Sequence, residues 1–189
     1  MGAFGISAGK KIFMKIFIIV GMPGSGKNIA RQYAETNNIP YFATGDLVRR
    51  EVSRRGLEPT PENTSTVSTE LRGQDGMGVT RFALSAALQS QKPVVFMEGM
   101  RSGPEIDLIR KEAESTIVAF LAPKRVRLKR ILSRGRPDDS PGHFEERDLR
   151  EISYGATVPI ALADEYILNT GSVEEAMQEL GKIVEKDQG

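Results

Sequence analysis

The stretch KIFIIVGMPGSGKNIA, residues 15–30, decides the fold. It opens with a short apolar run typical of a buried strand and ends in a helical pattern. Between the two, Gly21 is followed by four residues and then by Gly26 and Lys27, the spacing of a phosphate-binding loop. Glycines let backbone N–H groups turn toward phosphate oxygens, and the helix that follows adds the positive end of its dipole. The stretch therefore predicts nucleotide binding.

The ATP site is expected to use the whole loop and the turn after the last predicted strand. Lys27 is expected to reach the β and γ phosphates. The expected ATP-binding residues are Gly21, Met22, Pro23, Gly24, Ser25, Gly26, Lys27, Asn28, Ile29, Asn169 and Gly171.

Short apolar runs alternate with stretches of helical length along the rest of the chain. The candidate strands are 15–20, 40–43, 93–97, 116–121 and 164–168. This alternation predicts an α/β fold, with a five-stranded parallel sheet covered by helices on both faces. A length of 189 residues suits a single domain.

Two segments stand apart from this pattern. Residues 1–13 have little pattern and are excluded from the fold as a tail, an upstream start or a cloning remnant, because Met14 is a plausible true start. The single domain is therefore expected over 14–189. Within it, the polar segment 56–78 is expected to be exposed and mobile, with a marginal helix around 62–73.

The overall composition excludes several function classes. With 26 basic and 25 acidic residues, the net charge of +1 gives no global argument for a nucleic acid or membrane partner. The absence of cysteine excludes disulfides, thiolate zinc sites and thiol nucleophiles. The apolar run near the N-terminus is too short to span a bilayer. We expect a cytoplasmic protein without a membrane partner.

Three further motifs resemble the adenylate kinases. IPYFATGDLVRREV (39–52) resembles their acceptor-side segment, with Thr-Gly-Asp and an arginine three residues later. VVFMEGMRSGPE (94–105) resembles their strand that ends in Asp-Gly-Phe-Pro-Arg, shortened by one residue. RILSRGRPDDSPGHFEER (130–147) resembles their lid. The resemblance runs from Met14 to about residue 175. Its nearest group is a set of archaeal adenylate-kinase-related, dephospho-coenzyme A kinase-like P-loop proteins.

This resemblance implies a P-loop fold of the adenylate kinase type, with an acceptor-binding segment over about 44–78 and a short lid over about 130–147. The implied catalytic residues, which clamp the transferring group, are Lys27, Arg130, Arg134, Arg136 and Arg147. Asp138 and Asp139 are expected to orient the lid arginines. The implied acceptor-binding residues are Thr44, Gly45, Asp46, Arg49, Gly99, Arg101 and Glu105, with Arg49 and Arg101 on the acceptor phosphate.

The residue chemistry supports the same reaction. Transfer of a phosphoryl group between nucleotides depends on positioning and on charge stabilisation by arginine, lysine and Mg²⁺. A phosphate acceptor is already an anion and needs no general base, and the planar arginine fork binds its oxygens bidentately. On a helix over 124–134, Arg127, Arg130 and Arg134 share a face. We therefore expect transfer from ATP·Mg²⁺ to a nucleoside monophosphate, with AMP as the leading acceptor.

Two positions depart from the adenylate kinase pattern. Asn28 stands where many phosphate-binding loops have Ser or Thr; adenylate kinases have Gly there and Thr at the next position, occupied here by Ile29. Mg²⁺ is expected to be held mainly by phosphates and water, with Asn28 and Glu98 as its protein ligands, although Asn28 could instead weaken metal binding. Glu105 replaces a Gln that reads adenine; it could accept from the adenine amino group, favour the N–H edge of guanine, or stay clear of the base.

Other interpretations remain open at this stage. A kinase with an alcohol acceptor, such as dephospho-coenzyme A, would need a base, for which Asp46 is the best candidate. The basic stretch 124–136 could bind RNA and indicate an ATPase in RNA or ribosome assembly. Asn28 and Glu105 could also mark a nucleotide sensor with little turnover. Thr44 could simply cap a helix that begins near Gly45, with Asp46 complementing its dipole.

Overall fold

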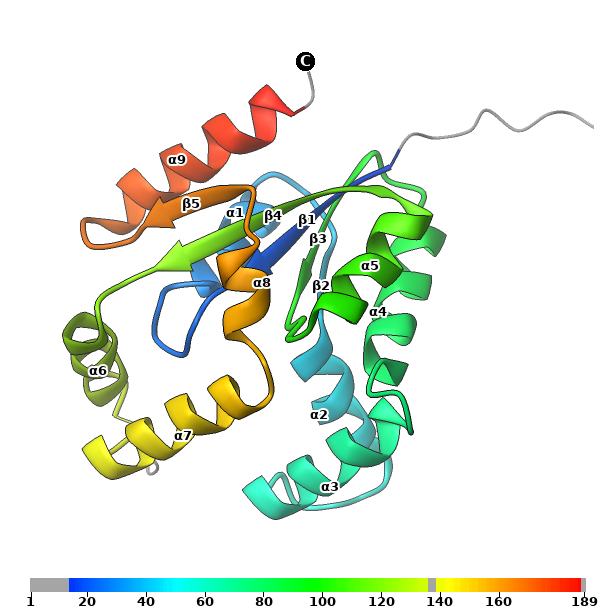
Figure 1. Cartoon of the computed structure of the whole chain (residues 1–189), viewed down its shortest axis with the longest axis vertical. Helices are drawn as coiled ribbons and strands as arrows, with labels where there is room; N and C mark the ends of the chain where they lie inside the picture. The colour runs from blue at the N-terminus through cyan, green and yellow to red at the C-terminus, as the bar shows by residue number, and fades with distance from the viewer. Residues whose placement is uncertain (1–13, 136–138, 188–189) are drawn as a thin grey trace, which may run out of the picture.

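A computed structural model describes residues 14–135 and 139–187, and in these residues five parallel strands form one sheet (Figure 1). The strands are β1 (Lys15–Val20), β2 (Tyr41–Ala43), β3 (Val94–Glu98), β4 (Glu114–Leu121) and β5 (Glu165–Leu168). Their order is β2-β3-β1-β4-β5, so β1, which leads into the glycine loop, is the central strand. The predicted α/β fold with a five-stranded parallel sheet is confirmed, and the five predicted strands differ from the observed ones by at most two residues at either end.

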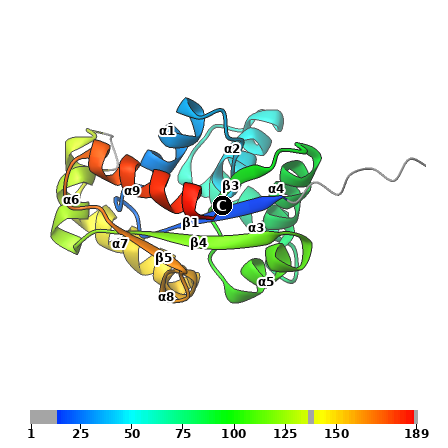
Figure 2. The same cartoon turned by 90° about the horizontal axis from the view of Figure 1, so that it is seen from above.

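Helices cover both faces of the sheet. They are α1 (Asn28–Thr36), α2 (Thr44–Arg54), α3 (Pro61–Arg72), α4 (Gly78–Gln89), α5 (Gly103–Glu112), α6 (Lys124–Ser133), α7 (Pro141–Ser153), α8 (Thr157–Ala161) and α9 (Val173–Lys186). Figure 2 shows α1 and α9 on one side of the sheet and α5 and α8 on the other. None of the helices in the described ranges is long and apolar enough to cross a bilayer.

Alternation along β1 divides its side chains between two cores. Ile16 and Ile18 pack in the cluster that includes residues of α4 and α5, whereas Phe17 and Ile19 pack in the cluster that includes residues of α1 and α9. All four side chains are fully buried. A strand buried on both faces explains why residues 16–20 are uninterrupted by polar residues.

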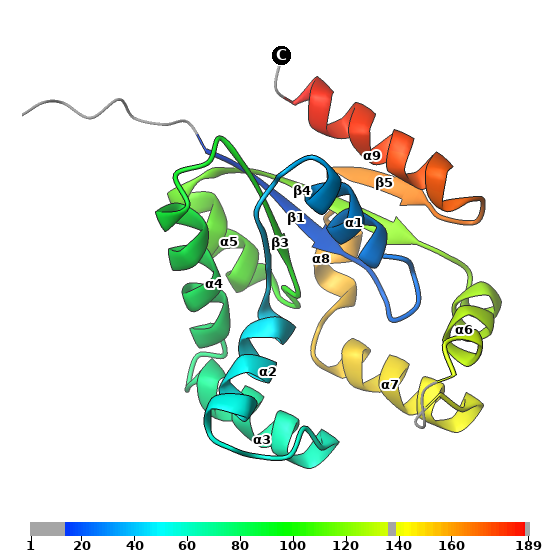
Figure 3. The ribbon, with the colours of Figure 1, turned by 180° about the vertical axis from the view of Figure 1, so that it is seen from behind.

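Two helical arms extend beyond the end of the sheet at which β1 and β3 finish. Figures 1 and 3 show α2 and α3 forming one arm and α6 and α7 forming the other, with the loop after β1 between them. Since the carboxyl ends of parallel strands meet at one edge, the arms flank the place where ligands bind in open α/β sheets.

The polar segment 56–78 contains α3, as predicted, and most of its residues are exposed. Pro61 begins the helix, and the Thr60 side chain caps it by accepting a hydrogen bond from the Asn63 N–H at 3.2 Å. Val67 is fully buried in a cluster with Val48, Val52 and Val79, which we call the valine cluster. The predicted mobility of this segment stays a prediction.

The capping role suggested for Thr44 is wrong. Helix α2 begins at Thr44 itself, Ala43 is the N-cap residue, and no side chain caps this end. The Thr44 hydroxyl instead donates to the Gly99 carbonyl at 3.4 Å, so it links α2 to the end of β3. Asp46 does lie in the first turn of α2, where a carboxylate complements the helix dipole.

Candidate nucleotide and acceptor site

The glycine loop follows β1 and runs directly into α1, the local structure that its sequence predicts. Gly26 has φ +105°, and a Cβ at this position would lie 1.9 Å from Asn169 Nδ2. Only glycine therefore fits at this point of the loop.

Two side chains from later in the chain hold the loop carbonyls. Asn169, which follows β5 and is 2% exposed, donates from Nδ2 to the Ser25 carbonyl at 2.8 Å. Arg130 on α6 in turn donates to the backbone carbonyl of Asn169 at 3.0 Å and to its Oδ1 at 3.2 Å. Asn169 lines the cleft, as an ATP-binding residue would, and it also braces the loop.

Lys27 is the last residue of the loop and the only positively charged side chain in residues 21–27. Its Nζ donates to the Gly21 carbonyl at 2.7 Å and lies 3.9 Å from Glu98 Oε1. Burial lowers the pKa of Lys27, and the nearby Glu98 carboxylate opposes this effect. A phosphate placed in the loop would add negative charge beside Lys27 and would favour its charged form.

A single cleft of about 710 Å³ joins the loop to both arms. Most predicted site residues line it, so residues that follow β1, β2, β3 and β5 meet residues of α6 at one place. These lining residues are Gly21, Pro23, Gly24, Gly26, Lys27, Asn28, Ile29, Thr44, Gly45, Arg49, Glu98, Gly99, Arg101, Arg130, Arg134 and Asn169.

Other predicted site residues lie off this lining. They are Met22, Ser25, Asp46, Glu105, Arg147 and Gly171. Arg136 and Asp138 lie outside the residues that the structure describes. Ile29 lines the cleft although it is only 3% exposed, and it packs in the core beneath α1.

Arg101 follows β3 and lines the cleft. Its Nε and Nη2 donate to the two carboxylate oxygens of Glu151 on α7 at 2.7 and 2.9 Å. Its guanidinium carbon also lies 5.3 Å from the centre of the Tyr154 ring. Both Arg101 and Glu151 line the cleft, so the ion pair borders the ligand space.

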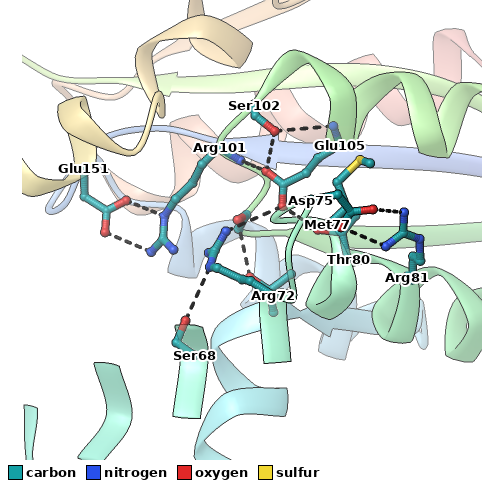
Figure 4. Close-up of polar contacts among 12 residues, drawn as sticks. Ser68, Arg72, Asp75, Met77, Thr80, Arg81, Arg101, Ser102, Glu105 and Glu151 are labelled. Atoms are coloured by element: carbon teal, nitrogen blue, oxygen red, sulfur yellow. Dashed lines mark hydrogen bonds and ion pairs between the residues drawn. The ribbon is translucent and has the colours of Figure 1, made fainter. Parts of the chain in front are cut away.

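Glu105 forms a buried hub behind Arg101 (Figure 4). Its carboxylate, 3% exposed, accepts from the Thr80 hydroxyl at 2.6 Å, the Arg101 backbone N–H at 2.8 Å and the Ser102 hydroxyl at 3.0 Å. Arg72 on α3 lies 4.0 Å away. Glu105 does not line the cleft, and its role toward an acceptor base stays a prediction.

Asp46 links the two sides of the cleft through arginines. It accepts from Arg31 on α1 at 2.6 Å and from Arg49 on α2 at 2.5 Å. Partial burial alone would raise the pKa of Asp46, but the hydrogen bonds from Arg31 and Arg49 hold the pKa below its usual value. The carboxylate therefore stays ionised and paired at neutral pH.

The expected metal ligands lie at the mouth of the loop. Asn28 is exposed at the start of α1, and Glu98 ends β3, where it accepts from the Tyr41 hydroxyl at 2.7 Å. Burial, followed by the Glu98 charge, raises the pKa of Tyr41, which keeps that hydroxyl a donor. An amide and a carboxylate oxygen suit Mg²⁺. The described residues contain no cluster of three or more His, Cys, Asp or Glu that could hold a metal, so such an ion would depend mainly on phosphate and water.

The described part of the predicted lid contains an ion pair between Arg134 and Asp139. Arg134, at the end of α6, donates from Nη2 to Asp139 at 2.7 Å and from Nε at 3.3 Å, which is the orienting contact expected of Asp139. Arg127 does not join Arg130 and Arg134 at the cleft. It is 7% exposed, donates to Asp148 on α7 at 2.7 and 2.5 Å, and reaches the Pro23 carbonyl at 2.9 Å.

Comparison with known proteins places this fold and site in a family. A model of the AAA domain matches residues 20–145. A UPF0200 protein of Hyperthermus butylicus is 37% identical over 174 residues, which covers 90% of this chain and 94% of that protein. The chain belongs to the UPF0200 family. Another UPF0200 protein, from Thermococcus gammatolerans, is 38% identical over 179 residues, with 90% of this chain and 94% of the relative covered.

Solved structures share the fold of this UPF0200 protein at low sequence identity. A Thermus thermophilus protein aligns with a TM-score of 0.67 at 18% identity, over 93% of this chain and 98% of its own. Shikimate kinase from Acinetobacter baumannii, in complex with shikimate, aligns with a TM-score of 0.55 at 16% identity, over 93% and 94%. These likenesses give a P-loop kinase-like fold. The specific resemblance to adenylate kinases stays a prediction.

Several side chains of the UPF0200 site were missed in the sequence. Arg31, Arg72 and Glu151 contact or lie beside predicted site residues, and Asp148 binds Arg127. One signal was available, because Asp148 and Glu151 are three residues apart and therefore share a face of α7. The arginine partners of this face, Arg127 and Arg101, lie 21 and 50 residues away in the sequence. Local spacing does not reveal such contacts.

Proposed function

We propose that this UPF0200 protein is an ATP-dependent nucleotide kinase that transfers the γ-phosphoryl group to a nucleoside monophosphate, with AMP as the first candidate. One observation carries the proposal: the loop lysine, Lys27, and the acceptor-side arginines, Arg49 and Arg101, line the same cleft. A cleft of about 710 Å³ is within the usual range for small-molecule sites. Cations on both sides suit two phosphorylated ligands that meet there.

The state of Asp46 favours a phosphate acceptor over an alcohol. An alcohol acceptor needs a base that takes up a proton near neutral pH. Asp46 was the best candidate, but it is held by Arg31 and Arg49, and its pKa is lowered. A carboxylate in this state is a weak base and a good positioner of arginines. A phosphate acceptor needs no base.

The proposed roles follow from position. Lys27, Arg130 and Arg134 would hold the transferring phosphoryl group, and Arg49 and Arg101 would hold the acceptor phosphate. Arg136 and Arg147, from the lid, would join them when the lid closes and excludes water. With both phosphates fixed in line, transfer would yield two diphosphates.

Mg²⁺ would be coordinated by Asn28 and Glu98, and when bound it would neutralise charge on the β and γ phosphates. The position of Lys27 does not depend on the metal, because its ammonium already contacts the Gly21 carbonyl. We therefore expect nucleotide binding to persist without Mg²⁺ and turnover to require it.

The structure weakens the argument for RNA binding. Of the basic residues on α6, Arg127 is buried against Asp148, and Arg130 points to the loop. Lys124 pairs with Glu145 at 3.0 Å. Three of the described basic residues of α6 are therefore engaged within the protein.

The test is Mg²⁺-dependent ADP formation from ATP with AMP, GMP, CMP, UMP, dephospho-coenzyme A or no acceptor. Lys27→Ala and Arg101→Ala should each reduce acceptor-dependent turnover by at least about 100-fold, because each removes a charge that stabilises the transferring or accepting phosphate. Lys92→Ala, on an exposed turn outside the cleft, is the matched control and should retain full activity. Turnover only with dephospho-coenzyme A, or ADP formation that ignores every acceptor, would replace the proposal by a hydroxyl kinase or an ATPase.

A further inference from the structure

Arg101, the proposed acceptor-phosphate residue, is already engaged by a carboxylate in the structure. Both oxygens of Glu151 accept from Nε and Nη2 of the Arg101 fork, at 2.7 and 2.9 Å. Phosphate binds the same fork with the same bidentate geometry. An acceptor phosphate that uses this edge of Arg101 must therefore displace Glu151.

We propose that Glu151 acts as an internal competitor that holds Arg101 in the empty site and lowers the affinity of the site for acceptor phosphates. This inference rests on the proposed function, because it takes Arg101 as a ligand of the acceptor. A phosphate monoester carries a charge of about −1.5 to −2 near pH 7 and offers three oxygens. A monoanion such as a sulfate ester interacts more weakly with Arg101, so it gains less from displacing Glu151 than a phosphate does.

The backbone of Arg101 is fixed independently of its side chain (Figure 4). Its N–H donates to Glu105, which is itself held by Thr80 and Ser102. The guanidinium can therefore exchange one anion for another while the turn after β3 stays in place. This arrangement suits a residue whose partner changes during the reaction cycle.

Glu151 has other cations within its electrostatic range. The side chains of Arg101 and Glu151 are 26% and 18% exposed, so their pair is only partly screened by water. Charge–charge interaction with Glu151 also reaches Lys27 and Arg72. A displaced Glu151 therefore stays in a cationic environment, which lowers the cost of releasing Arg101 and makes exchange with a phosphate practicable.

The experiment measures calorimetric affinity for AMP and for adenosine 5′-sulfate, which keeps the tetrahedral group but is a monoanion, at pH 8. The proteins are the wild type, Glu151→Gln, and Glu146→Gln. Glu146 is exposed on the same helix, so its variant removes the same charge away from the cleft. Glu151→Gln should tighten AMP by about fivefold to tenfold and should tighten the sulfate by no more than that, because displacement of Glu151 costs the same whichever anion displaces it. Glu146→Gln should match the wild type.

A double-mutant cycle separates this role from a structural one. In an Arg101→Lys background, which keeps the charge but removes the fork, Glu151→Gln should change AMP affinity by less than about twofold. Unchanged or weaker AMP binding in Glu151→Gln overturns the inference while leaving the kinase proposal intact. If ATP binds but neither AMP nor its sulfate analogue binds to any variant, both the inference and AMP as acceptor are overturned.

Discussion

Arg127 and Asp148 form a buried ion pair that fastens the two lid-side helices to each other and to the phosphate loop. Two hydrogen bonds, at 2.7 and 2.5 Å, join α6 to α7, and a third from Arg127 reaches the Pro23 carbonyl at 2.9 Å. The Phe144 ring lies 5.2 Å from the guanidinium carbon. The loop and α7 therefore share one anchor.

Removing one partner should show the importance of this anchor. Asp148→Asn leaves the Arg127 charge uncompensated in a site where the two side chains are 8% and 10% exposed. We expect the free energy of unfolding to fall by about 3 to 5 kcal/mol in urea titrations. Asp107→Asn, at an exposed position of α5, should stay within about 0.5 kcal/mol of the wild type.

The double variant Arg127→Met, Asp148→Leu should regain much of the stability but not the contact with Pro23. A loss below about 1 kcal/mol in Asp148→Asn would show that the pair is not an anchor.

Asn169 should affect ATP binding through the loop. Asn169→Ala removes the shorter of the two hydrogen bonds to the buried Ser25 carbonyl, which keeps only the bond from Arg130 Nη1 at 3.4 Å, and it removes one acceptor of Arg130. Loss of one hydrogen bond costs about 1 kcal/mol, so ATP affinity should fall by about fivefold when the loop loses its geometry. Asn37→Ala, at the exposed far end of α1, is the matched control. Calorimetry with ATP checks the difference, and equal affinities would contradict a bracing role.

Gly99 should tolerate no side chain. Its φ is +102°, and a Cβ would lie 2.1 Å from the Thr44 hydroxyl that links α2 to β3. Gly99→Ala should reduce the free energy of unfolding by more than about 1 kcal/mol and raise the acceptor KM. Gly103→Ala is the control, because a Cβ there meets nothing within 4 Å and should be neutral or slightly stabilising. Equal stabilities of the two variants would refute the steric argument.

Asp46 should behave as a positioning group whose effect depends on pH. Its folded-state pKa is lowered by Arg31 and Arg49, so its ion pairs stabilise the fold fully above the ordinary aspartate pKa of about 3.9. That stabilisation is lost as the pH falls through the lowered folded-state pKa. Asp46→Asn should therefore be less stable than the wild type by up to about 1 kcal/mol at pH 7, because the site is partly exposed, and the gap should close in more acidic solution.

The same variant tests the catalytic assignment. A positioner should change kcat by less than about tenfold, whereas loss of a general base costs about 100-fold to 10,000-fold. A rate loss in the larger range, together with a lost acidic limb in the pH profile, would favour an alcohol acceptor. Steady-state kinetics with AMP over pH 5 to 9 measures both the change in kcat and the shape of the pH profile.

The fold was predictable because its signals are local. The run at residues 15–20 and the spacing from Gly21 to Lys27 depend on neighbours in the chain, and the structure confirms the strand and the turn that they predict. The helix predicted over 124–134 ends one residue earlier, at Ser133. Even the weak helix around 62–73 is present, although its anchoring by Val67 and Leu71 could not be read from a polar sequence.

The site was less predictable because it depends on pairings between distant segments. Helical spacing predicted that Arg127, Arg130 and Arg134 share a face of one helix. It did not reveal that Arg130 and Arg134 line the cleft while Arg127 is buried against Asp148. Glu105 aligned with a base-reading position, yet its carboxylate is occupied by Thr80 and by the backbone of Arg101. Which side chain meets which partner in the fold cannot be read from residue type or from local spacing.

The valine cluster gives the arm formed by α2 and α3 a small core of its own. Val48, Val52, Val67 and Val79 pack helices α2, α3 and α4 together, and none of them belongs to the two large clusters that sandwich the sheet. Substitutions that repack these four valines should therefore change the interior of the arm and leave the two large cores of the sheet in place.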